Sequence, residues 1–108
     1  MRFVLFVIDH ASNSGNATEM EAIDAFNDSL RSNGQWVFAC GIGAPTTASL
    51  MDARGGRSEV IDGSLFHEID FYSGFWIVNV DSDDQAQELA LAASHACNRR
   101  VELRPLLG

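Results

Sequence analysis

The segment from residue 60 to residue 82 constrains the fold of this chain more than any other part of it. It reads VIDGSLFHEIDFYSGFWIVNVDS, which is a turn, a polar and aromatic stretch and a buried strand in succession. Asp62-Gly63 is a turn dipeptide, because glycine readily adopts a positive φ and aspartate bonds its own backbone in turns. Residues 74–80 are almost continuously apolar and aromatic, which is typical of a central β-strand. The chain is therefore expected to form a sheet with this strand inside it.

Three further strands are predicted. Residues 3–8 are apolar on both faces, which indicates another central strand, and Asp9 and His10 end it. Residues 35–43 form a strand that glycines and a proline break into a loop. Residues 101–107 form the last strand, in which Pro105 requires an edge or an end.

Two helices and a hairpin separate these strands. After a loop at residues 11–17, Thr18 and Glu21 form a capping box for a helix over residues 19–33. Ser82 and Gln85 cap a second helix that ends near residue 98. The segments 48–53 and 57–61 flank a Gly-Gly turn and form the hairpin.

The order of these elements predicts an α+β fold, a ferredoxin-like split βαβ arrangement with an inserted β-hairpin. Both helices then cover one face of an antiparallel sheet. A chain of 108 residues is one domain that buries only about two-thirds of its unfolded surface. Because two strands are apolar on both sides, we expect two sheets to pack face to face in a homodimer.

Composition excludes several classes of function. The net charge of −8 comes from 15 acidic residues against seven arginines and no lysine, which argues against nucleic acid as a partner. Without lysine there is no side-chain Schiff base and no anchor for pyridoxal phosphate. The opening apolar run is too short for a signal peptide or a membrane span, so a cytoplasmic protein without a membrane partner is expected. Cys40 and Cys97 have no paired spacing and are expected to be buried free thiols.

The chain resembles the YCII-related (DGPF-domain) family. Asp62, Gly63, Gly74 and Phe75 match the family pattern of Asp-Gly-Pro-Phe, a variable polar stretch, and Gly-Phe before a strand, while Ser64 and Leu65 depart from it. The resemblance extends over nearly the whole chain and implies a dimeric α+β barrel. A few members resemble small lyases or dehalogenases that use a His-Asp pair without metal or organic cofactor. Some are encoded near extracytoplasmic-function sigma factors. The histidine that the better-known members carry in helix one has no counterpart here.

Two histidines are candidates for acid–base catalysis. His67 lies beside Glu68 and close to Asp70 and Tyr72, and a carboxylate near a histidine fixes its tautomer for proton transfer. His10, at the end of a central strand, is the alternative candidate for this role. Either histidine is equally consistent with an exposed position that has no catalytic role.

The remaining candidates have structural alternatives as well. Asp62 is a candidate base, although turn formation explains it better. Arg54 is placed to clamp a substrate carboxylate, or is simply a solvated hairpin charge. The aromatic side chains favour a flat, apolar ligand, unless they serve only the core or the dimer interface. The predicted catalytic residues are thus His67, His10, Asp62 and Glu68, and the predicted substrate-binding residues are Asp9, Arg54, Phe66, Asp70, Tyr72 and Trp76.

No metal or cofactor is predicted, because the sequence contains neither metal-ligand spacing nor a glycine-rich nucleotide cradle. The sequence favours a homodimer that binds a small aromatic or polyketide-like metabolite. The reaction class is then a lyase, isomerase, dehydratase or cyclase that works by proton transfer. A non-catalytic ligand-binding or regulatory protein, or a cofactor-free monooxygenase, remains an alternative.

Overall fold

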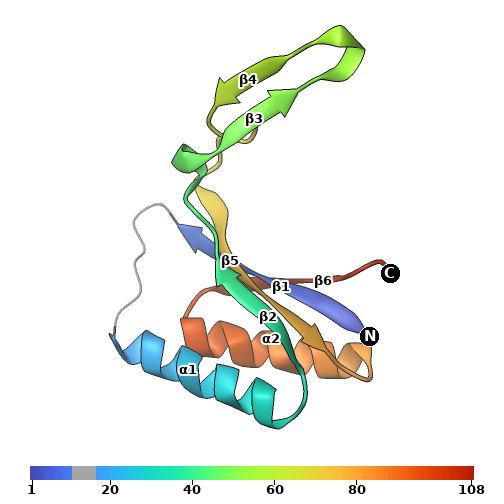
Figure 1. Ribbon diagram of the computed structural model, residues 1–108. Helices are drawn as coiled ribbons and strands as arrows, with labels where there is room; N and C mark the ends of the chain where they lie inside the picture. Colours follow the sequence, from blue (N-terminus) through green and yellow to red (C-terminus); the bar gives the residue numbers. More distant parts are fainter. Residues whose placement is uncertain (11–16) are drawn as a thin grey trace.

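A four-stranded antiparallel sheet carries two helices on one face (Figure 1). The computed structural model describes residues 1–10 and 17–108. The strand order is β2-β5-β1-β6. The elements of this layer are β1 (Arg2–His10), α1 (Ala17–Ser32), β2 (Trp36–Gly41), β5 (Asp70–Asn79), α2 (Asp83–Cys97) and β6 (Arg100–Pro105). The predicted ferredoxin-like α+β fold is confirmed, with the apolar strands β1 and β5 in the centre and β6 at an edge.

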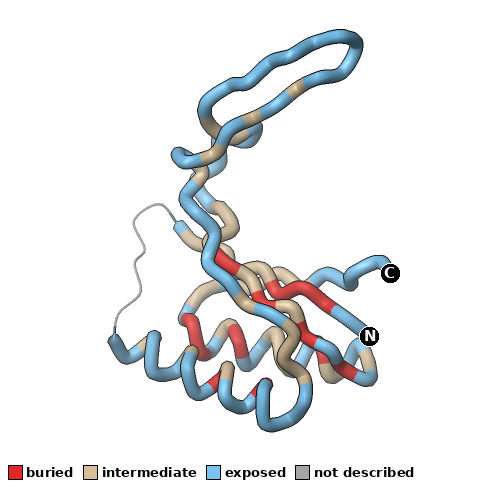
Figure 2. Tube along the Cα trace, viewed as in Figure 1, coloured by how far each residue is buried: buried red, intermediate tan, exposed pale blue. Residues whose placement is uncertain are grey.

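The hydrophobic core lies between the sheet and the two helices, where buried positions gather in Figure 2. Leu5, Leu30 and Val78 are fully buried there. Trp76 is 5% exposed and meets Phe26 edge to face at 5.3 Å. Its indole Nε1 donates a hydrogen bond to Asn27 Oδ1 at 2.7 Å, which satisfies the only polar atom of the ring.

The opposite face of the sheet is also apolar, and we call it the open face. Strand alternation places Val4, Phe6, Phe38, Phe75 and Ile77 on it, as the cross-strand pairs of β1, β2 and β5 show. Phe38 and Phe75 are in ring contact at 6.0 Å. Neither helix covers this face (Figure 1).

The helix starts agree with the sequence prediction in one case and differ in the other. Ser82 caps α2, since its Oγ accepts a hydrogen bond from the backbone N–H of Gln85 at 3.2 Å. The first helix begins at Ala17, so Thr18 lies inside its first turn, and the prediction that Thr18 is its cap was wrong. The predicted loop at 11–17 falls mostly outside the described residues. No helix in the described part of the chain has the length and apolar character needed to cross a membrane.

The predicted hairpin is confirmed as β3 (Ser49–Asp52) and β4 (Glu59–Asp62), which form a separate two-stranded sheet. It projects from the four-stranded sheet on the side away from the helices (Figure 1). Gly55 and Gly56 take positive φ angles of 57° and 81° at its tip, which explains the Gly-Gly sequence.

The cysteines follow the prediction only in part. Cys97 is buried, and burial raises the pKa of its thiol. Cys40 is exposed, and the prediction of a buried thiol was wrong there. Its position on β2 pairs with Phe75, so its side chain lies on the open face, which has no helix over it.

Gly74 marks a close approach between two strands. A Cβ at this position would lie 3.1 Å from the carbonyl oxygen of Cys40 on β2, whereas a Cβ at Gly41 would meet nothing closer than 3.8 Å. We expect Gly74→Ala to lower the free energy of unfolding by about 1–3 kcal/mol, because the backbone of β2 must shift. Gly41→Ala is the matched control, with an expected change below about 0.5 kcal/mol. Equal urea denaturation midpoints for the two variants would contradict this explanation of the glycine.

Candidate functional site

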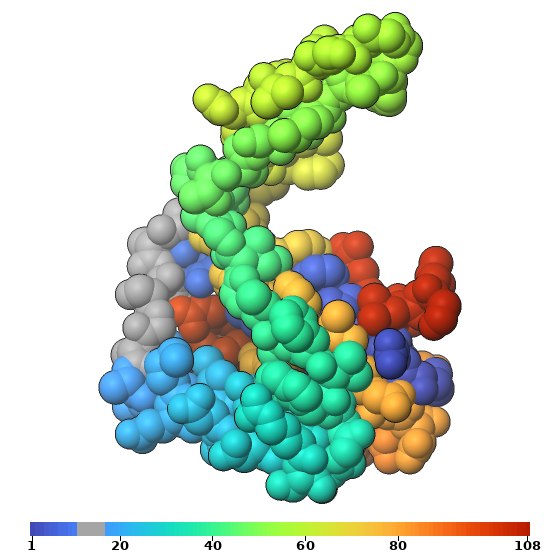
Figure 3. Space-filling view, in the orientation of Figure 1, coloured from blue at the N-terminus to red at the C-terminus, as the bar shows by residue number. Residues whose placement is uncertain are grey.

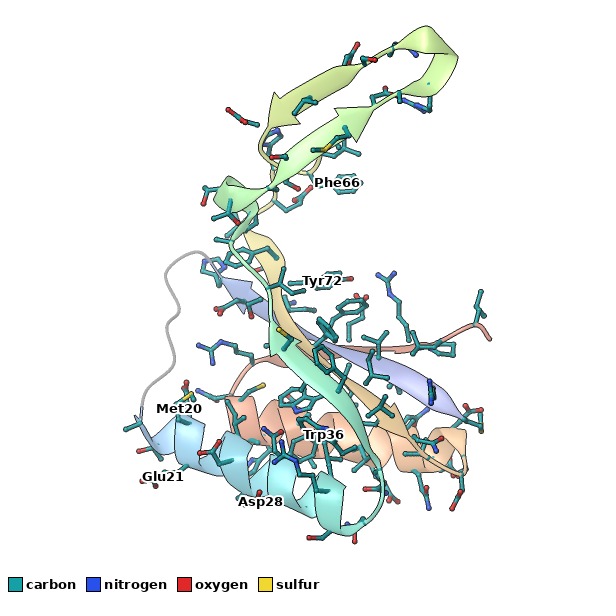
Figure 4. All side chains as sticks on the ribbon, viewed as in Figure 1. Met20, Glu21, Asp28, Trp36, Phe66 and Tyr72 are labelled. Carbon is teal, nitrogen blue, oxygen red and sulfur yellow. The ribbon has the colours of Figure 1, made fainter. Side chains whose placement is uncertain are left out.

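A pocket of about 920 Å³ lies between the base of the hairpin and the open face. Its size suits a small organic ligand. Figure 3 shows the hollow below the projecting hairpin. In Figure 4, Phe66 lies at the hairpin base and Tyr72 lies on the sheet below it, while Trp36 lies on the helix side. The pocket is therefore formed by the loops that flank the hairpin together with the sheet ends of β1, β5 and β6.

A β-bulge places the polar residues of β5 in this pocket. Val7 pairs with Gly74 and Ile8 with Tyr72, so Ser73 is an extra residue on β5. Because of this residue, the side-chain alternation changes phase along β5. Tyr72 and Asp70 consequently lie on the same face as Phe75, although their spacing from Phe75 is odd. The open face thus continues into the pocket without interruption.

His10 and Asp70 form a hydrogen-bonded pair at the rim of the pocket. They are direct partners across β1 and β5, with His10 Nδ1 3.0 Å from Asp70 Oδ1. Arg100 Nη2 donates to the other carboxylate oxygen at 2.8 Å. Hydrogen bonds from His10 and Arg100 hold the pKa of Asp70 below its usual value, so it remains a carboxylate. Asp70 lines the pocket, and His10 lies next to the pocket because it contacts Asp70. The His10 side chain is 58% exposed.

A second polar cluster forms one wall of the pocket. The Tyr72 hydroxyl donates to Glu102 Oε2 at 2.5 Å and accepts from Arg104 Nη2 at 2.7 Å. The Tyr72 ring stacks on Phe6 with centroids 4.3 Å apart. The hydrogen bond to Glu102 raises the pKa of Tyr72, so this hydroxyl stays protonated. Hydrogen bonds from Tyr72 and Arg104 lower the pKa of Glu102, which keeps it ionised.

The structure brings about half of the predicted site residues together. Phe66, Glu68, Asp70 and Tyr72 line the pocket, and His10, which does not line it, contacts the lining residue Asp70. His67 is exposed in the segment between β4 and β5 and does not line the pocket. Two further predicted site residues lie on the hairpin, away from the pocket. Asp62 is exposed at the end of β4. Arg54 lies at the tip, where its guanidinium pairs with Asp52 at 3.0 Å.

Asp9 and Trp76 lie on the helix side of the sheet, beside a second hollow of about 490 Å³. Asp9 contacts Arg99, whose Nε lies 3.2 Å from Asp9 Oδ2 without hydrogen-bond geometry. Arg99 is 7% exposed, donates to Glu19 at 3.2 Å and to the carbonyl oxygen of Cys97 at 2.7 Å. Burial lowers the pKa of Arg99, but the attraction of the Glu19 and Asp9 carboxylates outweighs this effect and the net shift is upward. These contacts of Arg99 connect β1, α1 and the end of α2. Asp9 therefore has a structural role.

Sequence reasoning missed two residues of the pocket, Arg100 and Arg104. They alternate with Val101 and Leu103 along β6 and lie on the open face together with Glu102. This period-2 pattern of charges was the signal that could have placed them at the site. Within residues 1–10 and 17–108, no group of three or more His, Cys, Asp or Glu side chains is arranged to hold a metal ion.

Comparison with known proteins identifies the family. No curated protein matches the chain. The family model of the YCII-related domain matches residues 1–107. Because the match covers all but the last residue, the chain belongs to the YCII-related domain family.

Proposed function

We propose that the pocket at the hairpin base binds a small organic metabolite with a flat, apolar part, and that the protein catalyses proton transfer on it without a cofactor. The observation that carries this proposal is the His10–Asp70 hydrogen bond at the rim of an aromatic-walled pocket. The reaction class is a lyase, isomerase, dehydratase or cyclase. An aromatic or polyketide-like metabolite fits the walls that Phe66, Phe71 and Tyr72 provide.

His10 is the histidine that we assign to proton transfer. Its Nδ1 faces the Asp70 carboxylate, which orients the ring, and its Nε2 makes no hydrogen bond within the described part of the chain. A histidine with one nitrogen held by a carboxylate and the other available is suited to general acid–base catalysis. His67 makes no comparable contact with Glu68 in the described residues, so the same role does not fall to it.

A non-catalytic ligand-binding protein is the second candidate. The walls of the pocket form without His10, and the imidazole is largely exposed. A ligand is therefore able to bind without proton transfer. Loss of turnover with retained binding in a His10 variant separates catalysis from binding, and unchanged behaviour in both respects favours the second candidate.

We further propose that two copies pair through their open faces to form the homodimer that the sequence predicts. The open face carries five apolar side chains across β1, β2 and β5, and neither helix covers it. Phe38 is 52% exposed, and Phe6, Phe75 and Ile77 are half-buried. Apolar surface that is left uncovered in this way is found at protein interfaces. Light scattering at micromolar concentration tests the pairing, and a stable monomer would refute it.

Replacing Tyr72 tests the ligand site. We expect Tyr72→Ala to weaken the binding of a flat aromatic ligand by about 10- to 100-fold, because a buried aromatic side chain contributes about 1.5–3 kcal/mol. Ligand-observed NMR against a panel of aromatic hydroxy- and keto-acids supplies the ligand and its affinity. Leu91→Ala, on the exposed part of α2, is the control and should bind the same compounds unchanged. Equal affinities for both variants would place the ligand elsewhere.

A further inference from the structure

A row of three side chains crosses the sheet at the pocket. Ile8 on β1 pairs with Tyr72 on β5 on one side and with Arg100 on β6 on the other, so the three lie on the same face of the sheet. All three line the pocket. Along β1 this row follows Val4 and Phe6 of the open face. Arg100 is therefore a wall residue of the pocket rather than part of the proposed dimer interface.

His10 and Arg100 contact the two oxygens of one carboxylate. His10 Nδ1 lies 3.0 Å from Asp70 Oδ1, and Arg100 Nη2 donates to Asp70 Oδ2 at 2.8 Å. His10 follows Ile8 by two residues on β1, and Ile8 is the cross-strand partner of Arg100. Such diagonal neighbours on one face of a sheet are about 7–8 Å apart, within reach of long side chains. A small molecule between them is therefore able to contact the imidazole and the guanidinium at the same time.

The guanidinium of Arg100 keeps donors that no group in the described part of the chain uses. A guanidinium has five N–H donors. Within residues 1–10 and 17–108, Arg100 makes one side-chain hydrogen bond, from Nη2 to Asp70. Arg104, the other arginine of the pocket, already uses Nε for Glu102 and Nη2 for Tyr72. The Arg100 side chain is 73% exposed, so its Nε and Nη1 are available to an oxygen atom of a ligand.

The charges of the lining residues are balanced. Glu68 and Asp70 offset Arg100 and Arg104, so the pocket has no excess of positive charge that attracts a ligand. What Arg100 adds is a set of directed N–H donors beside the imidazole. Donors held in fixed positions stabilise most strongly the negative charge that develops during a reaction. The position of Arg100 therefore suits the stabilisation of a reaction intermediate.

We propose that Arg100 is a catalytic residue that binds the carbonyl oxygen of the substrate and stabilises the enolate that forms when His10 removes a neighbouring C–H proton. The substrate is then a carbonyl compound with a hydrogen on the carbon next to the carbonyl group. His10 Nε2 takes this proton, the C–H electron pair becomes the carbon–carbon double bond, and the carbonyl π pair moves to the oxygen that Arg100 holds. The protonated imidazole returns the proton to carbon, which completes an exchange or an isomerisation. This inference rests on the proposed proton transfer and adds the group that stabilises the negative charge.

Binding of an enolate analogue tests this role before the substrate is known. 4-Nitrophenol is flat and aromatic, and its phenolate absorbs visible light, so spectrophotometric titration reports both binding and ionisation. We expect Arg100→Gln to weaken binding of the phenolate about 10- to 100-fold, as loss of a hydrogen bond to a charged group does. Binding of 4-nitroanisole, which has no acidic hydroxyl, should not change. Arg2→Gln removes the same charge from the exposed start of β1 and is the matched control.

The outcomes separate Arg100 from the ligand site itself. Equal phenolate affinities for Arg100→Gln and the wild type, or a loss in Arg104→Gln instead, would overturn the role of Arg100 and leave the site standing. Asp70→Asn should not weaken phenolate binding, because it keeps the guanidinium. A loss in Asp70→Asn as large as in Arg100→Gln would mean that Arg100 acts only through Asp70, which also overturns the direct contact. A wild-type protein that binds neither compound would refute the ligand site and this role together.

Exchange of carbon-bound hydrogen in D₂O gives a kinetic readout. The probe is 2-indanone, a flat ketone with C–H groups next to its carbonyl, and NMR follows its exchange. We expect Arg100→Gln to lower kcat about 10²- to 10³-fold with KM nearly unchanged, the usual effect of removing one donor to a developing oxyanion. Arg100→Lys keeps the charge without the planar fork and should give an intermediate kcat. A fall that comes entirely from a raised KM would show that Arg100 only binds the ketone, and would overturn its catalytic role.

Discussion

Replacing Trp76 with alanine is expected to lower the free energy of unfolding by about 3–5 kcal/mol, the cost of truncating a large buried aromatic side chain. Trp76 lies on the central strand β5, packs edge to face on Phe26 of α1, and donates its only polar hydrogen to Asn27. The variant loses the apolar contact between α1 and the sheet and also leaves the amide oxygen of Asn27 without its donor. Urea denaturation, monitored by far-ultraviolet circular dichroism, measures the change in the free energy of unfolding.

The control for this variant is Leu91→Ala on α2, where the side chain is 74% exposed and lies outside the proposed dimer interface. We expect a loss below about 1 kcal/mol, as for most surface substitutions. A similar loss for both variants would contradict the placement of Trp76 in the hydrophobic core.

Replacing His10 with alanine is expected to lower turnover about 10²- to 10⁴-fold, which is the usual contribution of a positioned general acid or base. The hydrogen bond from Arg100 remains in this variant and favours the carboxylate form of Asp70, so Asp70 does not replace the imidazole as a proton donor. Binding should change little, since His10 lies at the rim and the pocket walls remain. Exchange of substrate C–H for deuterium in D₂O, followed by NMR, measures proton transfer even when the full reaction is not known.

Two further variants separate catalysis from structure. Asp70→Asn keeps the size of the side chain but removes the charge that orients the imidazole, so we expect an intermediate loss of exchange. His67→Ala, outside the pocket, should exchange at the wild-type rate. If His67→Ala loses activity and His10→Ala does not, the assignment of the base is wrong.

Most of the fold was predictable because hydrophobic periodicity is a local property. The runs 3–8 and 74–80 are apolar on both faces, and β1 and β5 are indeed the central strands. Ser82 caps α2 as expected, and the Gly-Gly sequence forms the hairpin turn. The start of α1 was misplaced because Thr18 and Glu21 match a capping box equally well inside the first turn of a helix.

The candidate site was less predictable because it depends on register between distant strands. His10 and Asp70 are 60 residues apart and meet only through the pairing of β1 with β5. The bulge at Ser73 changes the face of the sheet on which Asp70 and Tyr72 lie. No residue type in this segment predicts the bulge. Sequence reasoning paired His67 with Glu68 or Asp70, whereas the Asp70 carboxylate contacts His10 on the neighbouring strand β1.

The central claim is that the pocket below the hairpin, with His10 and Asp70 at its rim, holds the ligand of this protein. A crystal structure of the purified protein with a compound from the ligand panel tests it most directly. We expect density for a flat molecule against Phe66 and Tyr72, with a polar atom within hydrogen-bond distance of His10 Nε2. Density in the second hollow beside Arg99, or a bound molecule that reaches neither His10 nor Asp70, would contradict the account.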